Sequence, residues 1–78
     1  MPRYHFHLHD RTGSTQDVEG RELADLSRAR ERAIREARAI ICEDVRQGRI
    51  DLSGRIEVTD GDGEMVLIIP FGDAVEQG

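Results

Sequence analysis

The sequence predicts an α+β domain in which a single helix packs on one face of a small antiparallel sheet. Three observations lead to this fold class. Hydrophobic residues alternate near the N-terminus, repeat about every 3.6 residues in the middle of the chain, and alternate again toward the C-terminus. A chain of 78 residues has room for one small core. We therefore expect residues 1–78 to form a single domain, with residues 72–78 as a frayed tail.

Residues 3–9 form the first expected strand. The apolar side chains of Tyr4, Phe6 and Leu8 alternate there with the imidazoles of His5, His7 and His9. Because alternate side chains of a strand point to opposite faces, we expect the three histidines to share one face of the sheet. A turn is expected at residues 10–15. Residues 17–23 offer only Val18 and Leu23 for burial, which is typical of a short, weak edge strand.

The middle of the chain predicts one amphipathic helix from Leu26 to Gln47. Asp25 stands where an N-cap carboxylate accepts from free backbone N–H groups, and Gly48 stands where a left-handed residue ends a helix. The small alanines of the apolar stripe allow close approach to a sheet. At helical spacing the stripe comprises Leu26, Ala29, Ala33, Ala37, Ile40 and Ile41, with Ile34 and Val45 at its margins.

The last third of the chain predicts a hairpin. Residues 55–59 alternate, residues 60–63 read Asp-Gly-Asp-Gly, and residues 64–69 form a second strand that is apolar on both faces. Pro70 marks the end of that strand. Because a doubly apolar strand favours cover on both faces, we place it in the centre of the sheet. The expected order along the chain is β-β-α-β-β, and the expected spatial order of the four strands is 2-1-4-3.

The composition indicates a thin core. Only 37% of the residues are hydrophobic, and 16 acidic against 11 basic residues give a formal charge of −5. Cys42 has no partner for a disulfide within the chain, and one helix covers only one face of a sheet. We therefore expect a homo-oligomer in which a second copy adds the missing burial. No apolar run approaches a membrane span, so we expect a soluble, cytoplasmic protein that does not contact membranes.

Four segments together are similar to a known family. They read Met1-Pro2-Arg3-Tyr4-His5-Phe6-His7-Leu8, Asp17-x-Glu19-Gly20-x-Glu22-Leu23-x-Asp25-Leu26, Gly54-Arg55-Ile56-Glu57-Val58-Thr59-Asp60 and Pro70-Phe71-x-Asp73-Ala74-Val75. The chain resembles a family of small bacterial proteins, common in alphaproteobacteria, that is classed as a domain of unknown function. The resemblance implies a free-standing domain in a bacterial cytoplasm and brings no activity or catalytic residue. His5 and His9 depart from the aromatic residue and the arginine expected there.

The histidine strand is the candidate metal site, formed by His5, His7 and His9. Neighbouring imidazoles on one strand face lie about 6.8 Å apart, and the outer pair about 13 Å apart. Since metal–nitrogen bonds are about 2.1 Å long, one ion can be shared by two neighbours only, and a further ligand must come from elsewhere. The alternative interpretation is a polar face whose imidazoles pack at a dimer seam, where protonation near pH 6 weakens the dimer.

Two other motifs suggest ligands less strongly. Residues 60–64 begin like a calcium loop but lack its later oxygen ligands, and hairpin chemistry explains Asp and Gly there. The exposed side of the predicted helix carries a stripe of arginines that would suit a nucleic-acid adaptor: Arg28, Arg32, Arg35 and Arg46. Interleaved carboxylates and the net charge of −5 oppose nucleic-acid binding.

No catalytic or cofactor motif is present. The serines have no nucleophile motif around them, no phosphate-cradling loop occurs, and the lone Cys42 lies on the polar flank of the helix. We therefore expect a non-enzymatic homo-oligomeric interaction or accessory module without a cofactor, with an unidentified protein partner also conceivable. The alternatives are a metal- or pH-responsive binder that uses the histidine strand, and a nucleic-acid adaptor that uses the arginine face.

Overall fold

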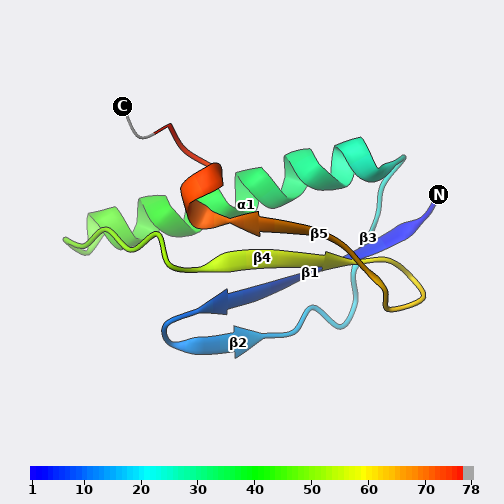
Figure 1. Cartoon of the computed structure of the whole chain (residues 1–78), viewed down its shortest axis with the longest axis horizontal. Coiled ribbons are helices and arrows are strands. Elements are labelled where there is room, and N and C mark those ends of the chain that lie inside the picture. The colour runs from blue at the N-terminus through cyan, green and yellow to red at the C-terminus, as the bar shows by residue number, and fades with distance from the viewer. Residues whose placement is uncertain (77–78) are drawn as a thin grey trace.

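The computed structural model describes residues 1–76. Within them it contains strands β1 (Arg3–Asp10), β2 (Gly13–Thr15) and β3 (Arg21–Glu22), helix α1 (Leu26–Arg46), strands β4 (Arg55–Thr59) and β5 (Met65–Pro70), and a short 3-10 helix, η1 (Phe71–Asp73). All strand pairs are antiparallel. Figure 1 shows α1 lying behind the sheet, which leaves the near face without a helix. The predicted fold class, α+β with one helix on one face of an antiparallel sheet, is confirmed.

Helix α1 forms as the sequence predicts. The Asp25 side chain accepts a hydrogen bond from the backbone N–H of Arg28 at 2.9 Å. At the other end Gly48 has a φ of 88°, a left-handed conformation that favours glycine. Three alanines of the apolar stripe have no exposed surface: Ala29, Ala33 and Ala37. Leu26 and Val45, at the ends of the stripe, are about half exposed. Their small side chains let α1 lie close to β4 and β5.

The spatial order of the sheet differs from the predicted 2-1-4-3. The strands follow the order β2-β1-β4-β5, so β4 lies beside β1 and the doubly apolar β5 lies at the edge. Polar pairing explains the difference. The side chain of His9 hydrogen-bonds Glu57, and that of His7 hydrogen-bonds Thr59, both on β4. The apolar residues of β5 offer no such partners to the imidazoles of β1.

The predicted second strand is also corrected. Residues 13–15, expected in a turn, form β2, and only residues 21 and 22 of the expected strand 17–23 pair with β1, as β3. A tight turn explains the early strand, because the Asp10 carboxylate accepts from both the backbone N–H and the hydroxyl of Thr12. The chain between β2 and β3 leaves the ladder but stays against the edge of β1 through Asp17.

The C-terminal part of the described chain is packed. Phe71 and Ala74 are both 1% exposed, and the Arg38 guanidinium donates to the carbonyl of Ala74 at 2.6 Å. The packed chain therefore extends past the predicted start of the tail at residue 72. Residues 77 and 78 of that tail lie outside the described residues.

The core lies between α1 and the sheet. Its buried members come from β1, α1, β4, β5 and the C-terminal segment: Tyr4, Phe6, Ala29, Ala33, Ala37, Ile56, Val58, Ile69, Phe71 and Ala74. Four of these are alanines, so the core is thin, as the composition indicates. The large side chains that are fully buried are Ile56, Val58 and Phe71.

Gly54 supports this core by leaving space for Phe71. A Cβ at position 54 would lie 2.6 Å from Cε2 of Phe71 and 3.0 Å from the carbonyl oxygen of His9. We expect Gly54→Ala to lower the free energy of unfolding by about 1–3 kcal/mol, because the buried ring must move. Gly61→Ala is the matched control, since its Cβ meets nothing closer than 3.9 Å. Equal urea midpoints for the two variants would contradict this account.

Candidate functional site

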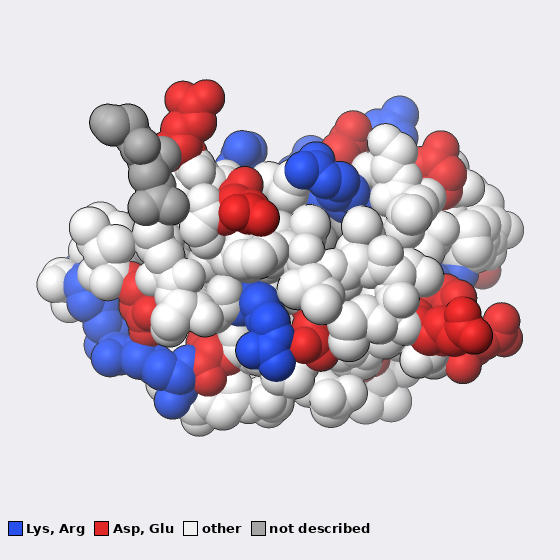
Figure 2. Space-filling model, in the orientation of Figure 1, with Lys and Arg blue, Asp and Glu red and all other residues white. Residues whose placement is uncertain are grey.

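The candidate site is the sheet face opposite α1, called here the open face. The strand register places on it the side chains of His5, His7, His9, Arg55, Glu57, Thr59, Met65 and Ile68. The predicted grouping of the three histidines on one face is therefore present. Figure 2 shows the molecule from this side, with uncharged atoms over most of its middle, where β4 and β5 lie in Figure 1, and acidic side chains toward the β4–β5 hairpin.

His9 lies in a hydrogen-bonded network with Glu57. Nε2 of His9 donates to Oε1 of Glu57 at 2.9 Å, and Nδ1 of His9 is 2.7 Å from the hydroxyl of Ser14 on β2. Nε of Arg55 donates to the other carboxylate oxygen of Glu57 at 2.7 Å. This bond from Arg55 is the main cause that lowers the pKa of Glu57 below its ordinary value. The carboxylate is thus neutralised locally, and this part of the face carries no net charge.

His7 is held by geometry that requires one tautomer. The backbone N–H of Asp17 donates to Nδ1 of His7 at 3.1 Å, so that nitrogen must present its lone pair. Nε2 then carries the proton, and it lies 3.0 Å from the Thr59 hydroxyl. His5 also bonds Asp17, but in the opposite direction: Nδ1 of His5 donates to the Asp17 carbonyl at 2.9 Å, whereas Nδ1 of His7 accepts from the Asp17 N–H. The two rings are parallel, with centroids 6.2 Å apart.

Asp17 joins the loop between β2 and β3 to the edge of β1. Its carboxylate accepts from the backbone N–H groups of Phe6 at 3.0 Å and of Gly20 at 3.1 Å. Partial burial opposes ionisation, but these two N–H donors, together with the nearby His5 and His7, hold the pKa of Asp17 below its ordinary value. Gly20, with a φ of 72°, lies against the His5 ring, where a Cβ would be only 2.8 Å from the imidazole. The loop is therefore fixed in position.

The fixed loop forms one wall of a surface groove of about 610 Å³. Phe6 and Leu8 line the groove from β1, and Glu36 lines it from α1. Val18 on the loop is 84% exposed. In the sequence Asp17 stands out only as the first residue of a family segment, and the spacing Asp-x-x-Gly to Gly20 is the local signal of its role.

The open face continues onto β5, which is the edge of the sheet. Ile68 lies opposite Glu57 and Met65 opposite Thr59, and these two apolar side chains are 51% and 49% exposed. Residues 65–69 carry no charge. One edge of β5 has no strand partner within residues 1–76. Backbone donors and acceptors without a strand partner therefore lie beside exposed apolar side chains.

The histidine strand does not form a metal cluster by itself. Among residues 1–76, no group of three or more His, Cys, Asp or Glu side chains is placed to hold one ion. Five of the six imidazole nitrogens of His5, His7 and His9 already have hydrogen-bond partners within this part of the chain. A metal ion bound here would have to displace some of these bonds.

The other sequence candidates are separate from the open face. Arg28, Arg32 and Arg35 come together on α1, and β3 adds Arg21 beside them, which the sequence analysis did not include. Asp60 closes the β4–β5 turn by accepting from the N–H groups of Asp62 and Glu64, as hairpin chemistry predicts. Cys42 is exposed and forms no disulfide within residues 1–76.

Fold and site together define a small α+β domain with one helix, one open sheet face and an uncharged edge strand. The chain matches the model of the DUF6894 family, described as a domain of unknown function, over residues 3–72. The protein therefore belongs to this family, in agreement with the resemblance seen in its sequence. No curated protein and no solved structure matches the chain.

Within residues 1–76, no helix combines the length and the apolar composition needed to cross a bilayer.

Proposed function

We propose that the protein is a non-enzymatic interaction module that works as a homodimer, in which β5 of one copy pairs antiparallel with β5 of the second. The observation that carries this proposal is the uncharged free edge of β5. Natural edge strands avoid pairing through charged residues, prolines or bulges along the free edge. Residues 65–69 contain no charge and no proline. The register shift between β4 and β5, which leaves Val66 as an extra residue, lies at the hairpin end of β5, and Pro70 stands at the other end.

The distribution of charge supports a second copy as the partner. The chain carries a formal charge of −5, so two copies repel each other unless their contact surfaces are neutral. On β5 and the adjoining part of β4 the only charged side chains of the open face are Arg55 and Glu57, which neutralise each other. The same strand paired about a two-fold axis thus brings no like charges together.

The surface area also supports a second copy as the partner. The chain exposes 5245 Å², compared with about 4,800 Å² for a compact monomer of this mass. Its shortest dimension is 16 Å, because one helix covers one face of one sheet. Edge pairing would bury Met65 and Ile68 and would extend the sheet across two copies. Since a single strand edge buries less than a standard interface of about 1,600 Å², we expect a concentration-dependent dimer.

The proposal includes no catalytic residue and no cofactor. The polar groups of the open face are occupied with one another, as the bonds of His7, His9 and Glu57 illustrate. A nucleophile or an acid–base pair aimed into a closed pocket is what an enzyme of this size would need. We propose that the module acts in the cytoplasm.

The test is to place a charge on the edge strand. We expect Ile68→Lys to convert the dimer to a monomer, because two lysines related by the two-fold axis would repel each other and lose the apolar contact. Ile50→Lys is the matched control, since Ile50 is 76% exposed and lies outside the sheet. Molar mass by light scattering gives the readout, and circular dichroism verifies the fold. An Ile68→Lys protein that remains dimeric would exclude β5 as the interface.

A further inference from the structure

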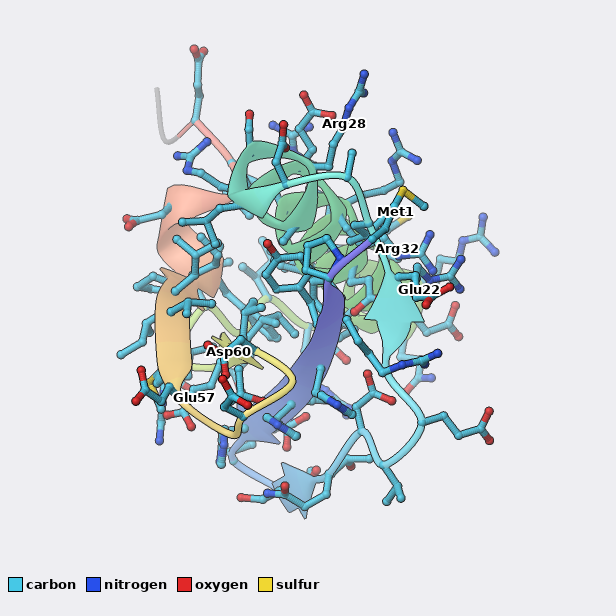
Figure 3. All side chains as sticks on the ribbon, turned by 90° about the vertical axis from the view of Figure 1, so that its right-hand side faces the viewer. Met1, Glu22, Arg28, Arg32, Glu57 and Asp60 are labelled. Atoms are coloured by element: carbon cyan, nitrogen blue, oxygen red, sulfur yellow. The ribbon has the colours of Figure 1, made fainter. Side chains whose placement is uncertain are left out.

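A hollow of about 180 Å³ lies between α1 and β3. Leu23 contributes an apolar wall to the hollow. The polar side chains are those of four arginines and one glutamate: Arg21, Arg28, Arg32, Arg35 and Glu31. Figure 3 shows Arg28 and Arg32 on the same side of the molecule as Glu22 of β3. The hollow is distinct from the open face and from the edge of β5.

The arginines of the hollow are only partly neutralised. Arg28 pairs with Glu31 at 3.4 Å, and Arg32 pairs with Glu36 at 3.2 Å. Within residues 1–76, Arg21 and Arg35 form no side-chain hydrogen bond and no ion pair. The guanidinium groups of Arg21 and Arg35 thus add uncompensated positive charge beside the paired Arg28 and Arg32, and like charges repel one another. An anion in the hollow would relieve this repulsion.

Two independent features of the fold bring these arginines together. On α1, positions 28, 32 and 35 are separated by four and three residues, which places them on one face of the helix. On the sheet side, Arg21 is held in β3 by its pairing opposite Tyr4. The hydrogen bond from the N–H of Leu23 to the carbonyl of Pro2, at 3.0 Å, fixes the chain at the point where it leaves β3.

We propose that this hollow binds the phosphate group of a small phosphorylated molecule, with Arg21 and Arg35 as its main contacts. A planar guanidinium can donate two parallel hydrogen bonds to phosphate oxygens, and those of Arg21 and Arg35 have no ion-pair partner within residues 1–76. The volume suits one or two phosphate groups. Nucleic acid is disfavoured, because Glu31 lines the hollow, Glu36 pairs with Arg32, and the chain as a whole is acidic.

The test is a titration of the whole protein with inorganic phosphate and pyrophosphate at low ionic strength, followed by amide NMR shifts. We expect saturable shifts for residues of β3 and the first half of α1. Arg21→Gln and Arg35→Gln should each weaken pyrophosphate binding about fivefold or more, since each removes a charged donor. Arg30→Gln is the matched control, because it removes the same charge from α1 outside the hollow, and it should change affinity less than about twofold.

Three results would overturn the proposal. The first is the absence of saturable shifts with pyrophosphate. The second is equal weakening by Arg30→Gln, which would indicate general attraction to positive charge. The third is tighter binding of a short single-stranded oligonucleotide than of pyrophosphate, which would identify a nucleic-acid surface. Far-UV circular dichroism of each variant shows that a loss of binding is not a loss of fold, and light scattering separates this site from dimerisation.

Discussion

Phe71→Ala is expected to lower the free energy of unfolding by about 3–5 kcal/mol, as truncation of a buried phenylalanine generally does. The ring is 1% exposed, and its edge lies directly over Gly54. At roughly 0.05–0.15 kcal/mol per residue, the whole domain has only about 4–12 kcal/mol of stability. The loss of this one side chain therefore removes a large part of the stability, and η1 loses its attachment to the core.

Two further variants make the measurement specific. Phe71→Leu keeps most of the buried volume and should cost about 1–2 kcal/mol. Ile50→Ala changes a side chain that is 76% exposed and should stay within about 0.5 kcal/mol of the parent. Urea unfolding followed by circular dichroism gives all three values. A Phe71→Ala protein as stable as Ile50→Ala would show that η1 is not part of the core.

Asp17→Ala is expected to cost about 2 kcal/mol, because it leaves two backbone donors without their acceptor. The donors are the N–H groups of Phe6 and Gly20, and the first of these is part of β1. Asp17→Asn keeps one acceptor oxygen and should cost less than Asp17→Ala. Asp62→Ala, at an exposed position in the β4–β5 turn, is the control and should be nearly neutral. Hydrogen exchange at Phe6 and Gly20 should accelerate only in the Asp17 variants.

The lowered pKa of Asp17 gives this contribution a pH dependence. The folded protein favours the ionised carboxylate, so the contribution is complete above the ordinary value of 3.8 and is lost as the pH falls through the lower folded value. The stability of the parent should therefore fall more steeply below pH 3.8 than that of Asp17→Asn. Parallel pH profiles for the two proteins would contradict the role given to this carboxylate.

Local signals in the sequence were sufficient for the helix and the hairpin. Asp25 and Gly48 mark the two ends of α1, and the spacing of the alanines marks its buried face. The turn between β4 and β5 is predicted by Asp60 and the glycines after it. Each of these signals acts over a few residues, where propensity and hydrogen bonding decide the structure.

The order of the strands depended on contacts that no local pattern contains. Apolar residues on both faces suggested that residues 64–69 lie in the centre of the sheet, yet Met65 and Ile68 remain half exposed at its edge. The pairing of β1 with β4 follows from side chains about fifty residues apart, such as His9 and Glu57. A sequence pattern reports which residues favour burial, but it does not report which strands have matching polar partners.

The candidate sites could be predicted only in part, because they too depend on contacts between distant parts of the chain. The shared face of His5, His7 and His9 follows from strand alternation alone. The hydrogen bonds of Asp17, which accepts from the N–H of Phe6 and donates its own N–H to His7, connect β1 to a loop about ten residues away. Arg21 joins the arginines of α1 only because β3 lies beside that helix. Both features require the tertiary fold.

The most direct test of the proposed interaction module is the molar mass of the purified protein by light scattering at pH 7.5, with chelator and with added zinc. The account predicts a dimer, with twice the 8.8 kDa of one chain, and the same mass under both conditions. A mass of 8.8 kDa at every protein concentration would contradict it. So would a monomer that assembles only with zinc, which would make the histidine strand, and not β5, the site of assembly.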